Sequence, residues 1–331
     1  MEDEVPGIDE NIFRAAVRRI FREQGFTAES MVHPKIRALV NATADICAGA
    51  IGPVLESGVI PDVMAQHLKE DVFVFSGFKT YRELREAADL LRDKNGLLKS
   101  FDRFYKDIAA INEKYNRHWL KAEYIFAQAS VEMAAKWVDF EQDGDEYDLQ
   151  YRTAGDDRVR YEHRVLHNVT LPPSDPFWDE FFPPNGWRCR CTVVQVRKGK
   201  FPRSDSNTAI QQGREATYQA GKNGVNKAAI FRYNPGKQQV VFPPHHPYYE
   251  VSERERRAIM TALYPEEKAY TVIPTIAGQL RIHSGHGKGE REENIRVASY
   301  FTNKYGYKID LLDNPDGVKS ADLSLIHISE P

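Results

Sequence analysis

A proline-rich stretch from Tyr151 to Cys191 constrains the fold of this chain more than any other feature. Five prolines and two glycines stand in it: Pro172, Pro173, Pro176, Pro183, Pro184, Gly155 and Gly186. Because proline fixes φ and removes a backbone donor, this stretch cannot be one regular helix and must be a long, built loop. Trp178, Trp187 and three phenylalanines also stand in it. These aromatic residues predict a small apolar core that holds the loop in place.

Residues 1–145 are predicted to form a helical domain. Apolar residues at helical spacing indicate a first helix that ends near Gly25 and a second over about 34–50. Thr80-x-x-Glu83 has the pattern of a capping box and predicts the start of a third helix. Residues 97–143 contain no glycine and no proline, and their apolar residues follow a helical period. We interpret the aromatic residues in this last segment as core residues and not as a base-stacking surface.

Residues 146–250 are predicted to form a loop-rich domain with short strands. Thr192–Val196 predicts a strand directly after the last cysteine. Ile230–Tyr233 and Gln239–Phe242, joined by Asn-Pro-Gly, predict a β-hairpin. Ser252 is a suitable cap for a helix that continues to about Leu263.

The order of elements changes after Lys268, so the fold class is predicted to be α+β. The elements expected there are a strand, a strand, a helix and a strand, over Tyr270–Ile273, Gln279–His283, Glu290–Tyr305 and Tyr307–Leu312. We expect residues 265–322 to form a partial α+β segment. The last residues, 323–331, do not continue this order of strands and helix, and we expect them to be a non-native tail.

Composition indicates an ordinary globular protein made in the cytoplasm. Hydrophobic residues make up 41% and charged residues 28% of the sequence. No apolar run approaches the roughly 18 residues that a membrane helix needs, so no membrane partner is expected. The acidic start, Met1-Glu-Asp-Glu4, lacks the basic and then apolar pattern of a secretory signal. Three cysteines are too few for a disulfide framework and favour a reducing compartment.

The charge of the chain is uneven. The formal net charge is -3, yet Gly186–Lys237 holds eleven basic residues against two acidic ones. Two interpretations stay open: a surface that faces packaged DNA or an acidic partner, and a solvated basic surface next to the acidic segment Asp139–Asp148.

His163, Cys189 and Cys191 are the candidate metal ligands of the sequence. Imidazole and thiolate suit zinc, and three protein ligands would leave a fourth position open. His167 is close in sequence to this set. The alternative is a packing or hydrogen-bonding role for the same residues. A third option, a cysteine nucleophile, requires the loop to fold back so that His163 can serve Cys189, and we expect it least.

The motifs of this stretch follow a specific order. They are Tyr151-Arg152-Thr-x-Gly155-Asp156-x-Arg158-Val-Arg160, Glu162-His163, Asp175-Pro-Phe-Trp178 and Pro183-Pro184-Asn-Gly186-Trp187-Arg188-Cys189-Arg190-Cys191. This order resembles the phage Mu F-like family of minor head proteins, also called phage head morphogenesis proteins. Many members of that family carry a Cys-x-x-Cys where Arg160 and His163 stand here, so a metal site does not transfer directly.

The resemblance implies a minor head protein that acts in procapsid assembly near the portal, with a further role in DNA packaging or delivery. Its partners would be the portal and other head proteins, first in the host cytoplasm and then in the virion. It implies no cofactor, with zinc left open. Asp156, Arg158 and Arg160 would tie the loop internally, Trp178 and Trp187 would anchor it, and Arg188 and Arg190 would fix its closure. The remaining motif residues expected to shape the loop are Tyr151, Arg152, Gly155, Asp175, Pro184 and Gly186.

The C-terminal segment carries a second resemblance. Glu290-Arg-Glu-Glu-Asn294, Ala298, Gly306–Leu312 and Lys319–Asp322 resemble the opening of a CdiA-type nuclease of the barnase, EndoU, colicin and RelE-like fold. The similarity covers about fifty residues. It implies an alternative function, a carrier of a toxin that cleaves tRNA or other RNA, inactive here because the segment would be truncated. An ordinary α+β appendage is the other interpretation, and catalytic residues are not assigned.

Overall fold

The computed structural model describes residues 6–221, 224–264, 270–283, 291–311 and 326–329. The chain divides into two units, Met1–Ile259 and Met260–Pro331, and each is described by itself. Helices and small sheets occur in both units, so the predicted α+β class is confirmed.

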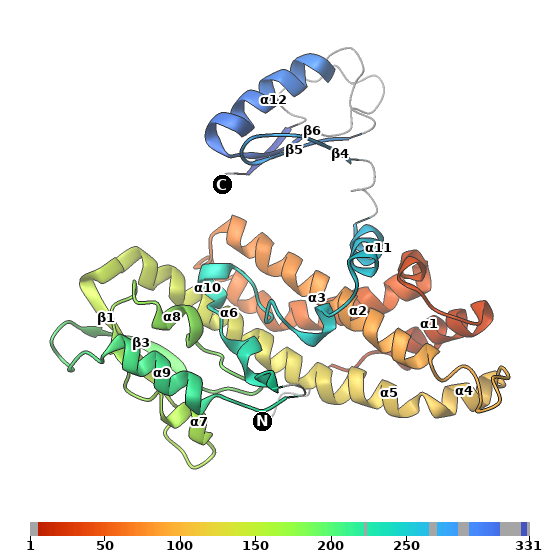
Figure 1. Ribbon diagram of the computed structural model, residues 1–331, viewed down its shortest axis with the longest axis horizontal. Helices are drawn as coiled ribbons and strands as arrows, with labels where there is room; N and C mark the ends of the chain where they lie inside the picture. Colours follow the sequence, from red (N-terminus) through yellow and green to blue (C-terminus); the bar gives the residue numbers. More distant parts are fainter. Residues whose placement is uncertain (1–5, 222–223, 265–269, 284–290, 312–325, 330–331) are drawn as a thin grey trace. The chain divides into compact units, whose positions relative to one another are not determined.

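Helices make up most of the first unit (Figure 1). The longer ones are α1 (Glu10–Glu23), α2 (Pro34–Leu55), α3 (Asp62–Ala88), α6 (Leu120–Asp143), α9 (Ser206–Ala216) and α11 (Glu253–Leu263), the last of which crosses the division between the units. The shorter ones are α4 (Phe101–Asp107), α5 (Ala109–Glu113), α7 (Tyr161–Arg164), α8 (Phe177–Glu180) and α10 (Pro235–Gln238). The irregular turns are η1 (Ala28–Val32), η2 (Lys114–Trp119), η3 (Gly144–Glu146), η5 (Lys227–Phe231) and η6 (Pro247–Tyr249).

The first three long helices form where apolar residues recur at helical spacing, but two predicted boundaries are wrong. α2 continues through Pro53 to Leu55. α3 begins at Asp62, directly after Pro61, and not at Thr80, which is fully buried inside the helix. A proline at a helix start costs no hydrogen bond, so Pro61 outweighs the capping pattern at Thr80. The cap predicted at Ser252 is confirmed, because the backbone N–H of Glu255 donates to its hydroxyl at 3.3 Å.

The segment predicted as one long helix is interrupted. α4 ends at Asp107, and a π-helical turn, η2, separates α5 from α6. The interpretation of its aromatic residues as core is correct for Tyr115, which is buried, and wrong for Trp119, which is 40% exposed.

Helix α2 has the length and mean hydropathy, 1.5, of a membrane-spanning helix by composition alone. This corrects the expectation that no segment reaches that threshold. In the first unit α2 packs against α1, α3 and α6. Ile36, Leu39 and Ile51 are buried there, so helix packing gives its apolar character a structural explanation.

A buried polar network links α3 to η2 and α6. The Lys79 ammonium forms an ion pair with Glu123, and both side chains are almost completely buried. One turn further along α3, Glu83 accepts a hydrogen bond from Asn116 Nδ2 at 2.5 Å. The second carboxyl oxygen of Glu83 has no hydrogen-bond partner among the described residues. Burial raises the pKa of Glu83 to about 8, so this side chain is protonated at neutral pH.

We expect Glu83 to make the first unit less stable as the pH rises from about 6.5 to 7.5. In the unfolded chain Glu83 is already ionised throughout this range, whereas the native state keeps its proton, because the folded pKa lies above the ordinary value of 4.5. The free energy of unfolding should fall by up to about 1.4 kcal/mol per pH unit. Asp71, whose pKa burial raises to about 6, acts in the same direction at lower pH.

Glu83→Gln, which mimics the protonated acid, should flatten this slope in urea unfolding followed by circular dichroism. Equal slopes for the variant and the parent would contradict the assignment.

Three strands form a sheet of order β2-β1-β3 at the end of the first unit opposite α1 and α4 (Figure 1). They are β1 (Tyr147–Arg152), β2 (Thr170–Leu171) and β3 (Thr192–Arg197). All pairs are antiparallel, and Arg152 of β1 is paired with Thr192 of β3. The strand predicted at Thr192–Val196 is therefore confirmed.

The predicted hairpin over Ile230–Phe242 is wrong. The segment forms η5 and α10 instead, because Asn234 caps α10 by accepting bonds from Gly236 N and Lys237 N. Pro235 occupies the first helical position, where proline is favoured. A Cβ at Gly236 would lie 2.2 Å from Trp137, so glycine permits this close contact with α6.

One aromatic core joins α6 to the proline-rich loop. Its members are Met133, Trp137, Phe140, Leu149, Tyr151, Leu166, Val169, Leu171, Phe177, Trp178, Phe181, Phe182, Val193 and Ala209. The predicted domains 1–145 and 146–250 thus share a core and form a single unit, since α6 contributes residues to both helix packing and loop packing.

The second unit contains a four-stranded sheet and one helix. Its elements are β4 (Tyr270–Ile273), β5 (Gln279–His283), α12 (Arg291–Tyr305), β6 (Lys308–Leu311) and β7 (Ile326–Ser329). The sheet order is β4-β5-β6-β7, with β5 and β6 parallel and the other pairs antiparallel. The four predicted elements are confirmed within the described residues. β7 lies in the stretch expected to be a non-native tail, and Lys319–Asp322 lies outside the described residues.

Candidate functional site

The loop between β1 and β3 is held by its own aromatic residues and by hydrogen bonds of its backbone and side chains. Trp178 is completely buried, and its indole N–H donates to the Pro172 carbonyl at 3.0 Å. Asp175 accepts from Phe177 N at 2.9 Å and from the Ser206 hydroxyl at 2.8 Å. These bonds hold the start of α8 against α9.

An ion pair joins the two ends of the loop. Arg190 donates both terminal nitrogens to the two carboxylate oxygens of Asp156, each at 2.7 Å. The hydrogen bonds from Arg190 lower the pKa of Asp156 to about 2. Arg158 lies 3.5 Å from the same carboxylate. The loop therefore closes on itself with the matched geometry of a guanidinium–carboxylate pair.

A second arginine crosses the loop beside this pair. Arg160 donates a hydrogen bond to the Trp187 carbonyl, and a Cβ at Gly186 would lie 2.5 Å from its guanidinium. Glycine at 186 therefore permits the guanidinium to approach the backbone. Trp187 is partly exposed and packs outside the aromatic core, against Phe126 and Phe231.

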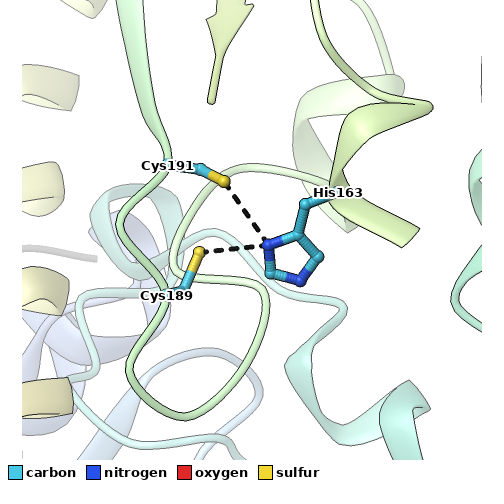
Figure 2. A group of neighbouring side chains, drawn as sticks. All are labelled: His163, Cys189 and Cys191. Carbon is cyan, nitrogen blue, oxygen red and sulfur yellow. Dashed lines mark hydrogen bonds between the residues drawn. The ribbon is translucent and has the colours of Figure 1, made fainter. Parts of the chain in front are cut away.

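With the loop closed by the Arg190–Asp156 and Arg160–Trp187 links, His163 lies beside Cys189 and Cys191 (Figure 2). His163 Nδ1 lies 3.5 Å from Cys189 Sγ and 3.4 Å from Cys191 Sγ. The three ligand atoms lie within 4.8 Å of one another, and His163 and Cys189 are buried. α7 carries the histidine and the turn before β3 carries the cysteines, so residues of two distant sequence segments meet.

The pKa values of the two thiols are shifted in opposite directions. Hydrogen bonds from the Cys191 thiol and from His163 lower the pKa of Cys189 well below its ordinary value, whereas the hydrogen bond to Cys189 and burial raise the pKa of Cys191. The Tyr151 hydroxyl donates to Asn185 Oδ1 at 2.9 Å and contacts Cys191. Burial raises the pKa of Tyr151 far above its usual range, so this hydroxyl stays protonated and supports the cluster without acting as an anionic ligand.

The geometry fits zinc. Bond lengths of about 2.3 Å to sulfur and about 2.0 Å to nitrogen in a tetrahedral site place nitrogen and sulfur about 3.5 Å apart. The measured distances of 3.4 and 3.5 Å match this separation. His167 does not join the cluster, because its Nδ1 accepts a hydrogen bond from Thr153 N at 3.1 Å.

The other predicted motif residues lie around this cluster in different roles. The Arg152 guanidinium lies 5.6 Å from the centre of the Phe201 ring, and Pro184 is buried after a cis peptide bond. Gly155 turns the chain with φ 76°, and Arg188 is exposed with φ 57°. Sequence reasoning did not find Asn185, which binds the Tyr151 hydroxyl from thirty-four residues away, because spacing alone carries no signal for such a contact.

Four of the eleven basic residues of Gly186–Lys237 form ion pairs in the described part of the chain. Arg190, Arg203, Arg214 and Lys237 pair with Asp156, Asp148, Glu180 and Asp179 respectively. One of these partners, Asp148, lies in the acidic segment Asp139–Asp148, so both interpretations of the basic segment stay open. The turn Arg197–Lys200 after β3 is exposed and carries three basic side chains.

Part of this chain is similar to known phage proteins. Residues 94–194 match the family described as Phage Mu protein F like protein. The matched region includes the whole proline-rich loop, both arginine links and the His–Cys cluster. The family match ends before the second unit, so the resemblance of that unit to a nuclease stays a prediction.

Three curated proteins are similar over short segments. They are a putative capsid assembly protein F of Escherichia phage Mu (50% identity, 13% of this chain and 10% of the relative), a Mu-like prophage FluMu F protein of Haemophilus influenzae (34%, 19% and 17%) and an uncharacterised protein of Methanocaldococcus jannaschii (45%, 14% and 7%). The similar segments thus span less than a fifth of each relative. No solved structure matches the chain.

Proposed function

We propose that this protein acts in the assembly of a phage capsid, as a minor head protein inside the procapsid near the portal. The observation that carries the proposal is the match of residues 94–194 to the Mu F-like family, together with the similarity to a protein named for capsid assembly. Its partners would be the portal and other head proteins, in the host cytoplasm during assembly and then in the virion. The exposed basic turn Arg197–Lys200 would be the surface that contacts packaged DNA.

The geometry of the loop supports a structural role for it. The pocket that His163 and both cysteines line has a volume of about 20 Å³, which is enough for one water molecule, and His163 also borders a second pocket of about 280 Å³. The loop ends are tied by the Asp156–Arg190 pair and by Arg160, and its centre is fixed by Trp178. A segment built in this way can present a defined surface to a neighbouring head protein.

Deleting the gene from an inducible phage genome tests the proposal. We expect lysis to proceed but infectious particles to be lost, with empty or aberrant heads in electron micrographs. A plasmid copy of the parent gene should restore the titre, and a copy with Trp178→Ala should restore it poorly. Normal heads and an unchanged titre after deletion would contradict the proposal.

We further propose a structural zinc ion at His163, Cys189 and Cys191. The ligand chemistry and the nitrogen–sulfur distances support it. Bound zinc would hold α7 against the turn before β3 and would add its binding free energy to the stability of the loop.

His163→Ala should reduce the metal content of the purified protein from about one zinc per chain to near zero in elemental analysis. His167→Ala is the matched control, because this exposed histidine lies four residues away and bonds to Thr153 instead. Equal zinc contents in the two variants, or none in the parent, would exclude the site.

A further inference from the structure

We propose that the His163–Cys189–Cys191 centre is completed by a carboxylate from an acidic side chain of a partner protein, which the surrounding arginines attract. This inference rests on the zinc site proposed above and names the group that occupies its fourth position. The centre would then be a docking point for another head protein.

One small pocket is lined by all three residues of the cluster, and His163 also borders a larger pocket of about 280 Å³. The residues that line the small pocket are Ala154, Arg158, Val159, Arg160, His163, Arg188, Cys189, Arg190 and Cys191. All three ligand residues border this pocket, and its volume of about 20 Å³ admits one ligand oxygen. Among the described residues, no further His, Cys, Asp or Glu joins this group, and the Tyr151 hydroxyl and His167 are bound to Asn185 and Thr153. The fourth ligand must therefore come from solvent or from another molecule.

The charge around the pocket favours an anion over water. Zinc with two thiolates and a neutral imidazole has no net charge, so the field at the open position is set by the surroundings. The charged side chains that line the pocket, His163 aside, are four arginines. Asp156 offsets part of this charge, but Arg190 already occupies both of its oxygens. The uncompensated positive charge would stabilise an incoming anion.

Two of these arginines are placed to receive such a group. Arg158 has a side chain that is 78% exposed, and its one ion pair with a described residue is a long contact, 3.5 Å, with Asp156. Arg188 is exposed, and its left-handed backbone, φ 57°, is unusual for a residue other than glycine. A guanidinium matches a carboxylate in geometry and forms charge-assisted hydrogen bonds with it.

The coordination chemistry of zinc favours a carboxylate over a phosphodiester. Asp and Glu oxygens are the anionic oxygen ligands that zinc takes from proteins, at about 2.0–2.2 Å. The pocket volume of about 20 Å³ is enough for one such oxygen. The inferred occupant is therefore an acidic side chain of a protein.

Cobalt-substituted full-length protein tests the inference, because cobalt replaces zinc in tetrahedral sites and reports its ligands by absorption. Sodium acetate serves as the probe, sodium phosphate as the competing anion and sodium perchlorate as the ionic-strength control. We expect acetate to shift the visible cobalt bands saturably and perchlorate to leave them unchanged. The double variant Arg158→Ala/Arg188→Ala should need about tenfold more acetate for half-saturation, while its cobalt content stays that of the parent.

The outcomes separate the inference from the metal site. Cobalt bands with sulfur character that do not respond to acetate would overturn the carboxylate and leave the metal site intact. A response to phosphate but not to acetate would likewise overturn it. Absence of sulfur-to-cobalt absorption would overturn the metal site and the inference together. An acetate response that is equal in the parent and in the double variant would overturn the role of the arginines.

Discussion

Replacing Trp178 by alanine will destabilise the first unit by about 3–5 kcal/mol, the usual cost of removing a buried tryptophan. Trp178 is completely buried and packs against Phe177 and Phe182, with ring centroids 4.9 and 6.2 Å away. Its loss would also leave the Pro172 carbonyl without its indole donor. Thermal unfolding followed by circular dichroism should show a midpoint lower by roughly 10 °C, since about 2–4 °C accompanies each kcal/mol in a unit of this size.

Trp187→Ala is the matched control. The indole of Trp187 is partly exposed and contacts Phe126, Phe231 and His246 outside the aromatic core. We expected both Trp178 and Trp187 to anchor the loop, but their difference in burial predicts a clearly smaller loss for Trp187→Ala. Equal losses in the two variants would contradict the placement of Trp178 at the centre of the loop.

Lys79→Met will cost about 3–5 kcal/mol, because it leaves the Glu123 carboxylate buried without its cation. Both members of this ion pair are almost completely excluded from water, so the unpaired charge cannot be solvated. Among the described residues, the hydrogen bond that Glu123 keeps is the one from the Tyr248 hydroxyl, at 2.9 Å. Urea unfolding gives the free energy of the parent and of the variant.

The double variant Lys79→Met/Glu123→Leu should recover much of that loss, since apolar residues replace both charges. The coupling energy between the two positions, measured by the double-mutant cycle, should exceed about 1 kcal/mol. Losses that simply add would show that the two side chains do not form a buried pair.

Sequence reasoning predicted the elements whose local pattern agrees with their tertiary environment. α1, β3 and the strands and helix of the second unit follow from apolar periodicity and turn residues, and the prolines of the loop exclude regular structure there. The hairpin failed because Asn234 and Pro235 start a helix whose glycine packs on Trp137, a contact almost one hundred residues away in sequence. Local pattern cannot report such a partner.

The candidate site was only partly predictable, because its residues come together through contacts that are distant in sequence. The types of His163, Cys189 and Cys191 indicate zinc chemistry, but their convergence depends on how Arg160 and Arg190 close the loop. No pattern in the sequence indicated the buried polar network around Lys79 and Glu83. Charged residues are usually exposed, and only the packing of α3 against α6 and η2 removes these from water.

Quantitative mass spectrometry of purified, DNA-filled phage particles tests the central claim most directly. If the protein is built into the head, its peptides should remain at a constant ratio to the major capsid protein after repeated density-gradient purification, and at a few copies per particle. Their loss from the particle fraction during purification, with the protein left in the lysate, would contradict a role in the capsid.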